Sequence, residues 1–215
     1  MKKAGSGTDV SPSTIDFRLY VITDRRLLPV GTFVERIIEI VTEGIKVVQL
    51  REKDLSAREQ IELAKKLREY PAKLFINDRA DITQAIGADG LHIPEHSFPV
   101  DEARKIIGNI LIGKSAHSLE SALHSEKEGA DFITFGPVYD TPSKLQYGKP
   151  LGIEKLHEVT QQISIPVFAI GGIDPERAKV CIDAGAFGVS VISDLFGADN
   201  PKPQIQKYRE ALGAL

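Results

Sequence analysis

Short apolar runs alternate with longer amphipathic stretches along this chain. Eight runs of four or five residues are rich in apolar side chains, at positions 19–23, 46–50, 73–77, 90–93, 110–113, 132–135, 166–170 and 188–192. Runs that are nearly continuous in apolar residues are typical of strands covered on both faces. The pattern therefore predicts eight strands in a parallel sheet.

The stretches between these runs have helical periodicity. Apolar residues three and four positions apart form one stripe over positions 33–41, and Ser56, Ser118 and Asp174 each stand where a helix cap is expected. Eight strands alternating with helices imply crossover connections. The count of eight, and the lack of a glycine-rich dinucleotide motif after the first strand, favour a single (β/α)8 TIM barrel of the α/β class over an open doubly wound sheet.

Length and composition support one globular domain. The 215 residues fit a single core, and we predict a flexible N-terminal lead-in at 1–14 followed by a barrel domain at 15–215. The net charge of -3 predicts no nucleic-acid or membrane partner, and no stretch is long and apolar enough to cross a bilayer. The single cysteine, Cys181, suits a reducing compartment, so we expect a cytoplasmic protein. The sequence does not decide whether the protein forms a homodimer.

In this fold the active site lies where the strands end and the βα loops begin. Cationic and polar residues follow several of the predicted strands. Arg51, Lys53 and Lys144 come from the ends of two different strands, and together they would match a diphosphate. Asp78 is either the N-cap of the next helix or a Mg2+ ligand, and in the second case Asn77 would donate to a phosphate oxygen.

A second anion site is predicted after the seventh and eighth strands. Gly171 and Gly172 allow backbone N–H groups to approach a phosphate, and Ile192 and Ser193 add the next loop. His117, after the fifth strand, is either a packed histidine or a general acid/base, for which the near-neutral pKa of imidazole is suited.

At these residues the chain resembles the thiamine phosphate synthase / TenI family. The resemblance runs from Leu19 to Phe196. The motifs that carry it are Val48-Gln49-Leu50-Arg51-Glu52-Lys53, Asn77-Asp78-Arg79, Gly87-Ala88-Asp89-Gly90-Leu91-His92, Gly113-Lys114-Ser115-Ala116-His117-Ser118, Gly136-Pro137-Val138-Tyr139, Thr141-Pro142-Ser143-Lys144 and Ala169-Ile170-Gly171-Gly172-Ile173.

The resemblance implies that a hydroxymethylpyrimidine diphosphate loses pyrophosphate with the help of Mg2+, and that the nitrogen of a thiazole phosphate captures the pyrimidine cation. It assigns the diphosphate to Arg51, Lys53, Asn77, Ser115 and Lys144, the Mg2+ to Asp78, and the thiazole phosphate to Thr141, Ser143, Gly172, Ile192 and Ser193. We add Gln49 and Gly171 to the candidate substrate-binding residues. The candidate catalytic residues are His117, Lys144 and Ser115.

One position departs from the synthase pattern. Synthases usually have His-x-Gly-Gln-x-Asp after the fourth strand, whereas this chain has Ser97 in place of the last carboxylate. That change resembles the TenI branch, whose thiazole tautomerases need no metal and move a proton with a histidine at the His117 position. The joint presence of Lys53, Asp78 and Lys144 favours the synthase, in which Glu95 or an extra water would complete the Mg2+ site. A sensor of thiazole or thiamine phosphates without turnover is the third alternative.

Overall fold

The computed structural model describes residues 15–141 and 149–213. Its eight strands are all parallel and close into a barrel in sequence order, as predicted. The predicted lead-in at 1–14 and the candidate residues Ser143 and Lys144 lie outside the described residues. The strands are β1 (Leu19–Ile22), β2 (Val47–Leu50), β3 (Lys73–Asn77), β4 (Gly90–Ile93), β5 (Leu111–Ala116), β6 (Phe132–Phe135), β7 (Val167–Ile170) and β8 (Gly188–Val191).

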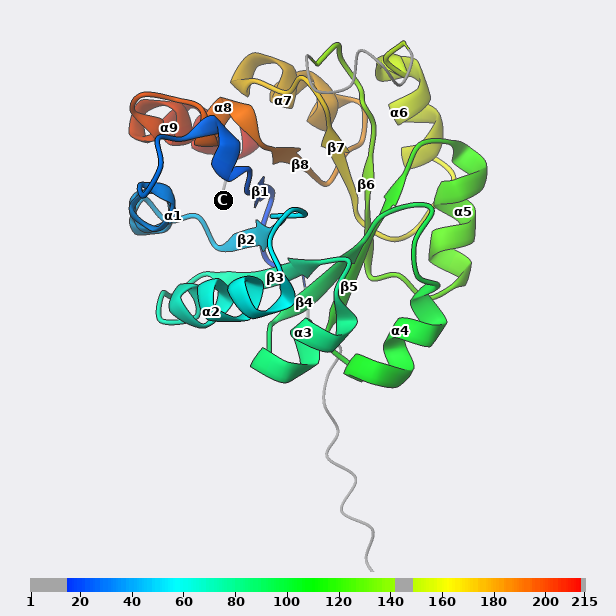
Figure 1. The fold of residues 1–215 in the computed structure, drawn as a ribbon. Coiled ribbons are helices and arrows are strands. Elements are labelled where there is room, and N and C mark those ends of the chain that lie inside the picture. Colours follow the sequence, from blue (N-terminus) through cyan, green and yellow to red (C-terminus); the bar gives the residue numbers. More distant parts are fainter. Residues whose placement is uncertain (1–14, 142–148, 214–215) are drawn as a thin grey trace, which may run out of the picture.

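Helices surround the barrel on its outside (Figure 1). Ser56 and Ser118 cap their helices with capping boxes, and the Asp174 side chain accepts from the backbone N–H of Arg177, so the three predicted caps are confirmed. The helices are η1 (Arg25–Leu27, 3-10), α1 (Phe33–Thr42), α2 (Ala57–Leu67), α3 (Ala80–Ile86), α4 (Val100–Ile107), α5 (Leu119–Lys127), α6 (Gly152–Thr160), α7 (Pro175–Asp183), α8 (Ser193–Phe196) and α9 (Pro201–Leu212).

β5 is longer than the apolar run predicted. It continues past Gly113 to Ala116, because Ser115 and Ala116 pair with Thr134 and Phe135 of β6. The buried Lys114 interrupts the apolar pattern, and its ammonium group donates to the Phe98 carbonyl at 3.2 Å. Ser115 is therefore a strand residue and not, as predicted, a loop residue.

The inside of the barrel changes character along its axis. A cluster of large side chains fills one level, formed by Phe17, Tyr20, Val47, Phe75, Leu111, Phe132 and Phe168. Gly90 and Gly113 make room for the rings, since a Cβ at either position would lie within 2.3 Å of a phenylalanine ring atom. Polar residues lie nearer the carboxyl ends of the strands. The apolar cluster therefore closes the barrel interior below the rim that these ends form.

Among the described residues, no helix combines the length and the hydropathy that a membrane span requires.

Candidate active site at the rim of the barrel

The predicted site residues that the structure describes come together at one end of the molecule. All eight strands run in parallel, so their carboxyl ends share one rim. Arg51 follows β2, Asn77 ends β3, and Ser115 lies near the end of β5. Gly172 follows β7 and Ser193 follows β8 on the same rim. The sequence predicts that these residues share one end of the barrel, and the structure places them there.

Two cations and one carboxylate of the predicted site lie on the β2–β3 side of this rim. Burial lowers the pKa of Arg51, and burial followed by the neighbouring Arg51 charge lowers the pKa of Lys53. Asp78 acts on Lys53 in the opposite direction, so the three charges are within electrostatic reach of one another. Asp24 and Glu52 raise the pKa of Arg51 and Arg26 lowers it, so charges of both signs surround the two cations that could bind an anionic ligand.

The Arg51 loop rests on a buried carboxylate that the sequence analysis did not single out. The Glu52 side chain accepts from the Thr23 hydroxyl at 2.6 Å and from the Arg25 backbone N–H at 3.2 Å. Thr23 in turn accepts from the Arg51 backbone N–H at 2.9 Å. Burial raises the pKa of Glu52. These contacts tie the loop after β1 to the loop after β2 and fix the backbone from which the Arg51 side chain extends.

Asp78 is not the cap of the helix that follows it. Arg79 is the N-cap residue of α3, and no side chain caps this helix. Asp78 has φ 60°, an uncommon value for a residue with a side chain, and its N–H donates to the His92 carbonyl at 2.9 Å. Its exposed carboxylate accepts from the Ser97 hydroxyl. The N-cap alternative is therefore wrong, and Ser97 contacts the carboxylate beside which the resemblance predicts a second ligand.

Glu95 makes its contacts elsewhere. Its carboxylate accepts from the His117 backbone N–H at 3.0 Å and lies 3.3 Å from the exposed His96 ring. Burial would raise its pKa, but hydrogen bonds from Ser121 and from the His117 N–H outweigh that effect and lower it. Glu95 thus supports the β5 end of the rim.

The polar level below the rim contains residues that the sequence analysis missed. The Gln49 amide donates to the hydroxyl of the buried Tyr20 at 2.9 Å. His92 Nε2 lies 3.0 Å from Ser115 Oγ, and Thr134 Oγ1 lies 3.3 Å from the same atom. Thr134 could have been found from the alternation of a strand, because it stands two residues after Phe132, a member of the interior aromatic cluster.

His117 lies at the end of β5 with a defined ring orientation. Its Nδ1 donates to the Gly136 carbonyl, which can only accept. The lone pair of the neutral ring is therefore on Nε2. The ring is half-buried, so a proton-transfer role and a packing role both remain compatible with its position.

The β7 end provides the backbone of the second predicted anion site. Gly171 and Gly172 have φ 97° and 64°. A Cβ at Gly172 would lie 2.4 Å from the Asp140 carbonyl oxygen, so only glycine fits there. The Tyr139 N–H donates to the Gly171 carbonyl at 3.0 Å, which joins this turn to the loop after β6. The half-buried Thr141 belongs to the same loop.

The β8 end lies beside this turn. Ile192 is half-buried and precedes α8, whose first residue is the exposed Ser193. The Asp194 carboxylate binds other side chains of the protein: it accepts from the Tyr208 hydroxyl at 2.7 Å and from the Gln204 amide. We therefore do not count it as a ligand contact. Ile192 and Ser193 remain the candidate ligand contacts of this loop.

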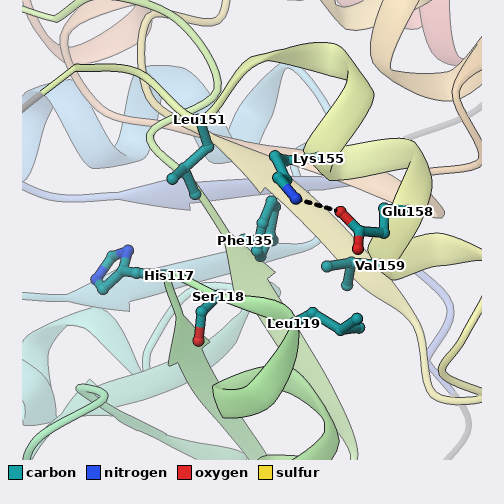
Figure 2. A pocket seen from close by; sticks show the side chains of 8 residues that line it. All are labelled: His117, Ser118, Leu119, Phe135, Leu151, Lys155, Glu158 and Val159. Carbon is teal, nitrogen blue, oxygen red and sulfur yellow. Dashed lines mark hydrogen bonds and ion pairs between the residues drawn. The ribbon is translucent and has the colours of Figure 1, made fainter.

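A small cavity lies outside the barrel and reaches the rim at His117, one of its lining residues (Figure 2). It has a volume of about 170 Å3 and lies between the start of α5 and the helix α6. Leu119, Phe135 and Leu151 give it an apolar lining, and the ion pair between Lys155 and Glu158 borders it. Ligand pockets usually have about 300–1,000 Å3, so we interpret this cavity as a gap between helices.

These features define the class of the protein: a (β/α)8 barrel with positively charged side chains and a glycine turn at the carboxyl ends of its strands, which is the place where such barrels bind phosphorylated ligands. The model of the family described as thiamine monophosphate synthase matches residues 19–195. The chain belongs to this family.

Similar proteins cover nearly the whole chain. It is 48% identical over 180 residues to a putative thiamine-phosphate synthase 2 of Aquifex aeolicus, covering 82% of this chain and 96% of the relative. It is 40% identical over 199 residues to the thiamine-phosphate synthase of Pyrococcus abyssi, covering 91% and 94%. Among solved structures, the thiamine phosphate pyrophosphorylase from Pyrococcus furiosus superposes with a TM-score of 0.83 at 37% identity, covering 92% and 96%.

Proposed function

We propose that this protein is a thiamine-phosphate synthase that joins hydroxymethylpyrimidine diphosphate to a thiazole phosphate. The bond between the pyrimidinylmethyl carbon and the diphosphate oxygen breaks, and its electron pair leaves with pyrophosphate. The thiazole nitrogen then supplies the pair that forms the new carbon–nitrogen bond. The observation that carries the proposal is the cluster of Arg51, Lys53 and Asp78 at the rim, in a chain that is 40% identical to a thiamine-phosphate synthase.

In this proposal Arg51 and Lys53 bind the diphosphate, with Lys144 as a third cation. Asn77 and Ser115 donate to its oxygens. Negative charge builds up on the departing pyrophosphate, and fixed cations stabilise that charge most strongly where water is partly excluded. The partial burial that lowers the pKa of Arg51 is such an environment. Gln49, which is 1% exposed and donates to the Tyr20 hydroxyl, would support the pyrimidine site from the polar level below.

The residues around Asp78 fit a Mg2+ ion that arrives with the diphosphate. Bound Mg2+ would neutralise charge on the leaving group. In the described part of the chain, no group of three or more His, Cys, Asp or Glu residues could hold a metal. Mg2+ commonly takes one or two carboxylates, with phosphate oxygens and waters as the other ligands. Asp78 with a diphosphate supplies such a set, and the Ser97 hydroxyl orients the carboxylate.

The second substrate would bind across the neighbouring loops. Thr141, Ser143, Gly171, Gly172, Ile192 and Ser193 are the proposed contacts of the thiazole phosphate. Backbone N–H groups in a left-handed glycine turn suit a phosphate, because no side chain blocks its approach. Two adjacent anion sites would hold the nitrogen of one substrate against the methylene carbon of the other.

The test is a reconstituted reaction. Purified protein is mixed with the pyrimidine diphosphate, the thiazole phosphate and Mg2+, and pyrophosphate and thiamine phosphate are measured. We expect stoichiometric formation of both products and their loss in Asp78→Ala. Asp54→Ala is the matched control, since Asp54 is an exposed carboxylate paired with Arg25. Absence of product above background from the wild-type protein would refute the proposal.

A second candidate function is a TenI-like thiazole tautomerase. Two observations favour it: the ordered His117 ring, and Ser97 beside Asp78 in place of a carboxylate. This function predicts isomerisation of thiazole phosphate carboxylate in the presence of EDTA, and loss of that activity in His117→Asn. Isomerisation by the wild-type protein without pyrophosphate release would select the tautomerase over the synthase.

A further inference from the structure

Three polar side chains from consecutive strands meet inside the barrel below the rim: His92 of β4, Ser115 of β5 and Thr134 of β6. His92 Nε2 lies 3.0 Å from Ser115 Oγ and 3.4 Å from Thr134 Oγ1. The Thr134 hydroxyl donates to Ser115 Oγ at 3.3 Å. His92 is 3% and Thr134 2% exposed, whereas Ser115 is half-buried. The cluster thus leads from the closed interior to the site, and only Ser115 can reach a ligand.

The environment of His92 determines where its ring proton lies. Nδ1 is buried and has no hydrogen-bond partner among the described residues, and it faces the backbone of Gly113, where a Cβ would lie 2.8 Å away. The His92 ring is only 3% exposed, and a buried site disfavours the charged imidazolium, so the ring carries one proton at neutral pH. A buried N–H without a partner is rarer than a buried acceptor without one. The proton therefore belongs on Nε2.

With this tautomer of His92, the Ser115 hydroxyl can only donate one further hydrogen bond. A hydroxyl group can accept two hydrogen bonds and donate one. His92 Nε2–H and the Thr134 hydroxyl both donate to Ser115 Oγ, so both of its lone pairs are used. The Ser115 proton then points away from both donors, toward the rim.

We propose that His92 and Thr134 are positioning residues that fix the Ser115 hydroxyl as a hydrogen-bond donor to a phosphate oxygen of the bound diphosphate. The identity of that anion rests on the proposed function. A hydroxyl that can rotate loses part of its interaction energy in reorienting, whereas one that is already oriented does not. The arrangement also selects against a ligand that presents a donor at this point, because Ser115 has no lone pair left to accept from it.

Thr134 offers a matched pair of variants. Thr134→Val keeps the shape and removes the hydroxyl, and Thr134→Ser keeps the hydroxyl and removes the methyl group. In Thr134→Val we expect the KM for the pyrimidine diphosphate, and the Kd for inorganic pyrophosphate with Mg2+, to rise about 5-fold to 10-fold, which corresponds to the loss of one net hydrogen bond. Thr134→Ser should restore wild-type values. The KM for the thiazole phosphate should change in neither variant.

A double-mutant cycle separates positioning from a general structural role. If Thr134 acts through Ser115, Thr134→Val should add no further loss to Ser115→Ala. An equal loss in both backgrounds would overturn the proposal. A Thr134→Val protein that binds pyrophosphate with wild-type affinity would also overturn the proposal.

The tautomer can be measured without any substrate. In 15N-labelled protein, the imidazole nitrogen shifts of His92 should show the proton on Nε2. A proton on Nδ1 overturns the inference, even if the protein is an active synthase. Failure of the proposed function would look different: the Nε2 proton would be present, but the wild-type protein would show no turnover, which would overturn the diphosphate as the anion that Ser115 contacts.

Discussion

Replacement of Gly172 by alanine tests whether the turn after β7 forms a phosphate site. Gly172 has φ 64°, and its added Cβ would lie 2.4 Å from the Asp140 carbonyl oxygen and 2.9 Å from the Tyr139 Cβ. A left-handed conformation costs alanine about 1–2 kcal/mol, and relief of the overlap costs about 1–3 kcal/mol more. We therefore expect a loss of about 2–5 kcal/mol in the free energy of unfolding.

The same substitution should weaken substrate binding. Separation of the turn from the loop after β6 would stretch the hydrogen bond between the Tyr139 N–H and the Gly171 carbonyl, and would move the N–H groups proposed to bind phosphate. A hydrogen bond to a charged group contributes about 1.5–3 kcal/mol, so the KM for the thiazole phosphate should rise roughly 10-fold to 100-fold.

Gly87→Ala is the matched control. Gly87 has φ 62° at the end of α3, nearly the same angle, but nothing lies within 4 Å of its added Cβ. It should lose about 1–2 kcal/mol of stability and keep both KM values. Urea titrations and steady-state kinetics of the two variants give the comparison. A Gly172→Ala protein with a wild-type KM for the thiazole phosphate would refute the assignment of this turn.

Three further predictions concern single side chains. Arg51→Met should raise the KM for the pyrimidine diphosphate about 10-fold to 100-fold, and initial-rate kinetics should show no change for the thiazole phosphate. Because the pKa of His92 is about 3 in the folded protein, acidification protonates this ring mainly in the unfolded state. Urea titrations should therefore show wild type losing about 1 kcal/mol more than His92→Gln between about pH 7 and pH 5.5. Burial raises the pKa of Cys181 to about 12, so alkylation measured by mass spectrometry should require denaturant.

The fold could be predicted almost completely because its signal is local. Each apolar run corresponds to a strand, and the caps at Ser56, Ser118 and Asp174 begin helices where expected. The error at β5 has a clear cause. Lys114 breaks the apolar pattern, but its ammonium group lies 3.6 Å from the Glu128 carboxylate, a partner 14 positions along the chain that no local window contains.

The site could be predicted only in part, because its positions follow from topology and its contacts do not. Arg51 and Gly172 could be assigned to one rim from the strand order alone. The partners of Asp78 could not, since its left-handed backbone and its bond to Ser97 depend on how two loops meet. His92 falls within a predicted strand, which agrees with its burial. What the sequence does not contain is its contact with Ser115, which depends on the register of β4 and β5.

The change in polarity along the barrel axis explains how the rim can hold charge. Aromatic rings close the interior below, and the neutral polar level of Gln49, His92 and Thr134 lies above them. Arg51 follows β2 above this level, and burial lowers its pKa even though the carboxylates of Asp24 and Glu52 act in the opposite direction. In the proposed reaction, a bound diphosphate would offset this cost of burial, because opposite charges attract more strongly in a partly desolvated site than in water. Burial of Arg51 thus carries an electrostatic cost at the rim, and the proposed anionic substrate would reduce it.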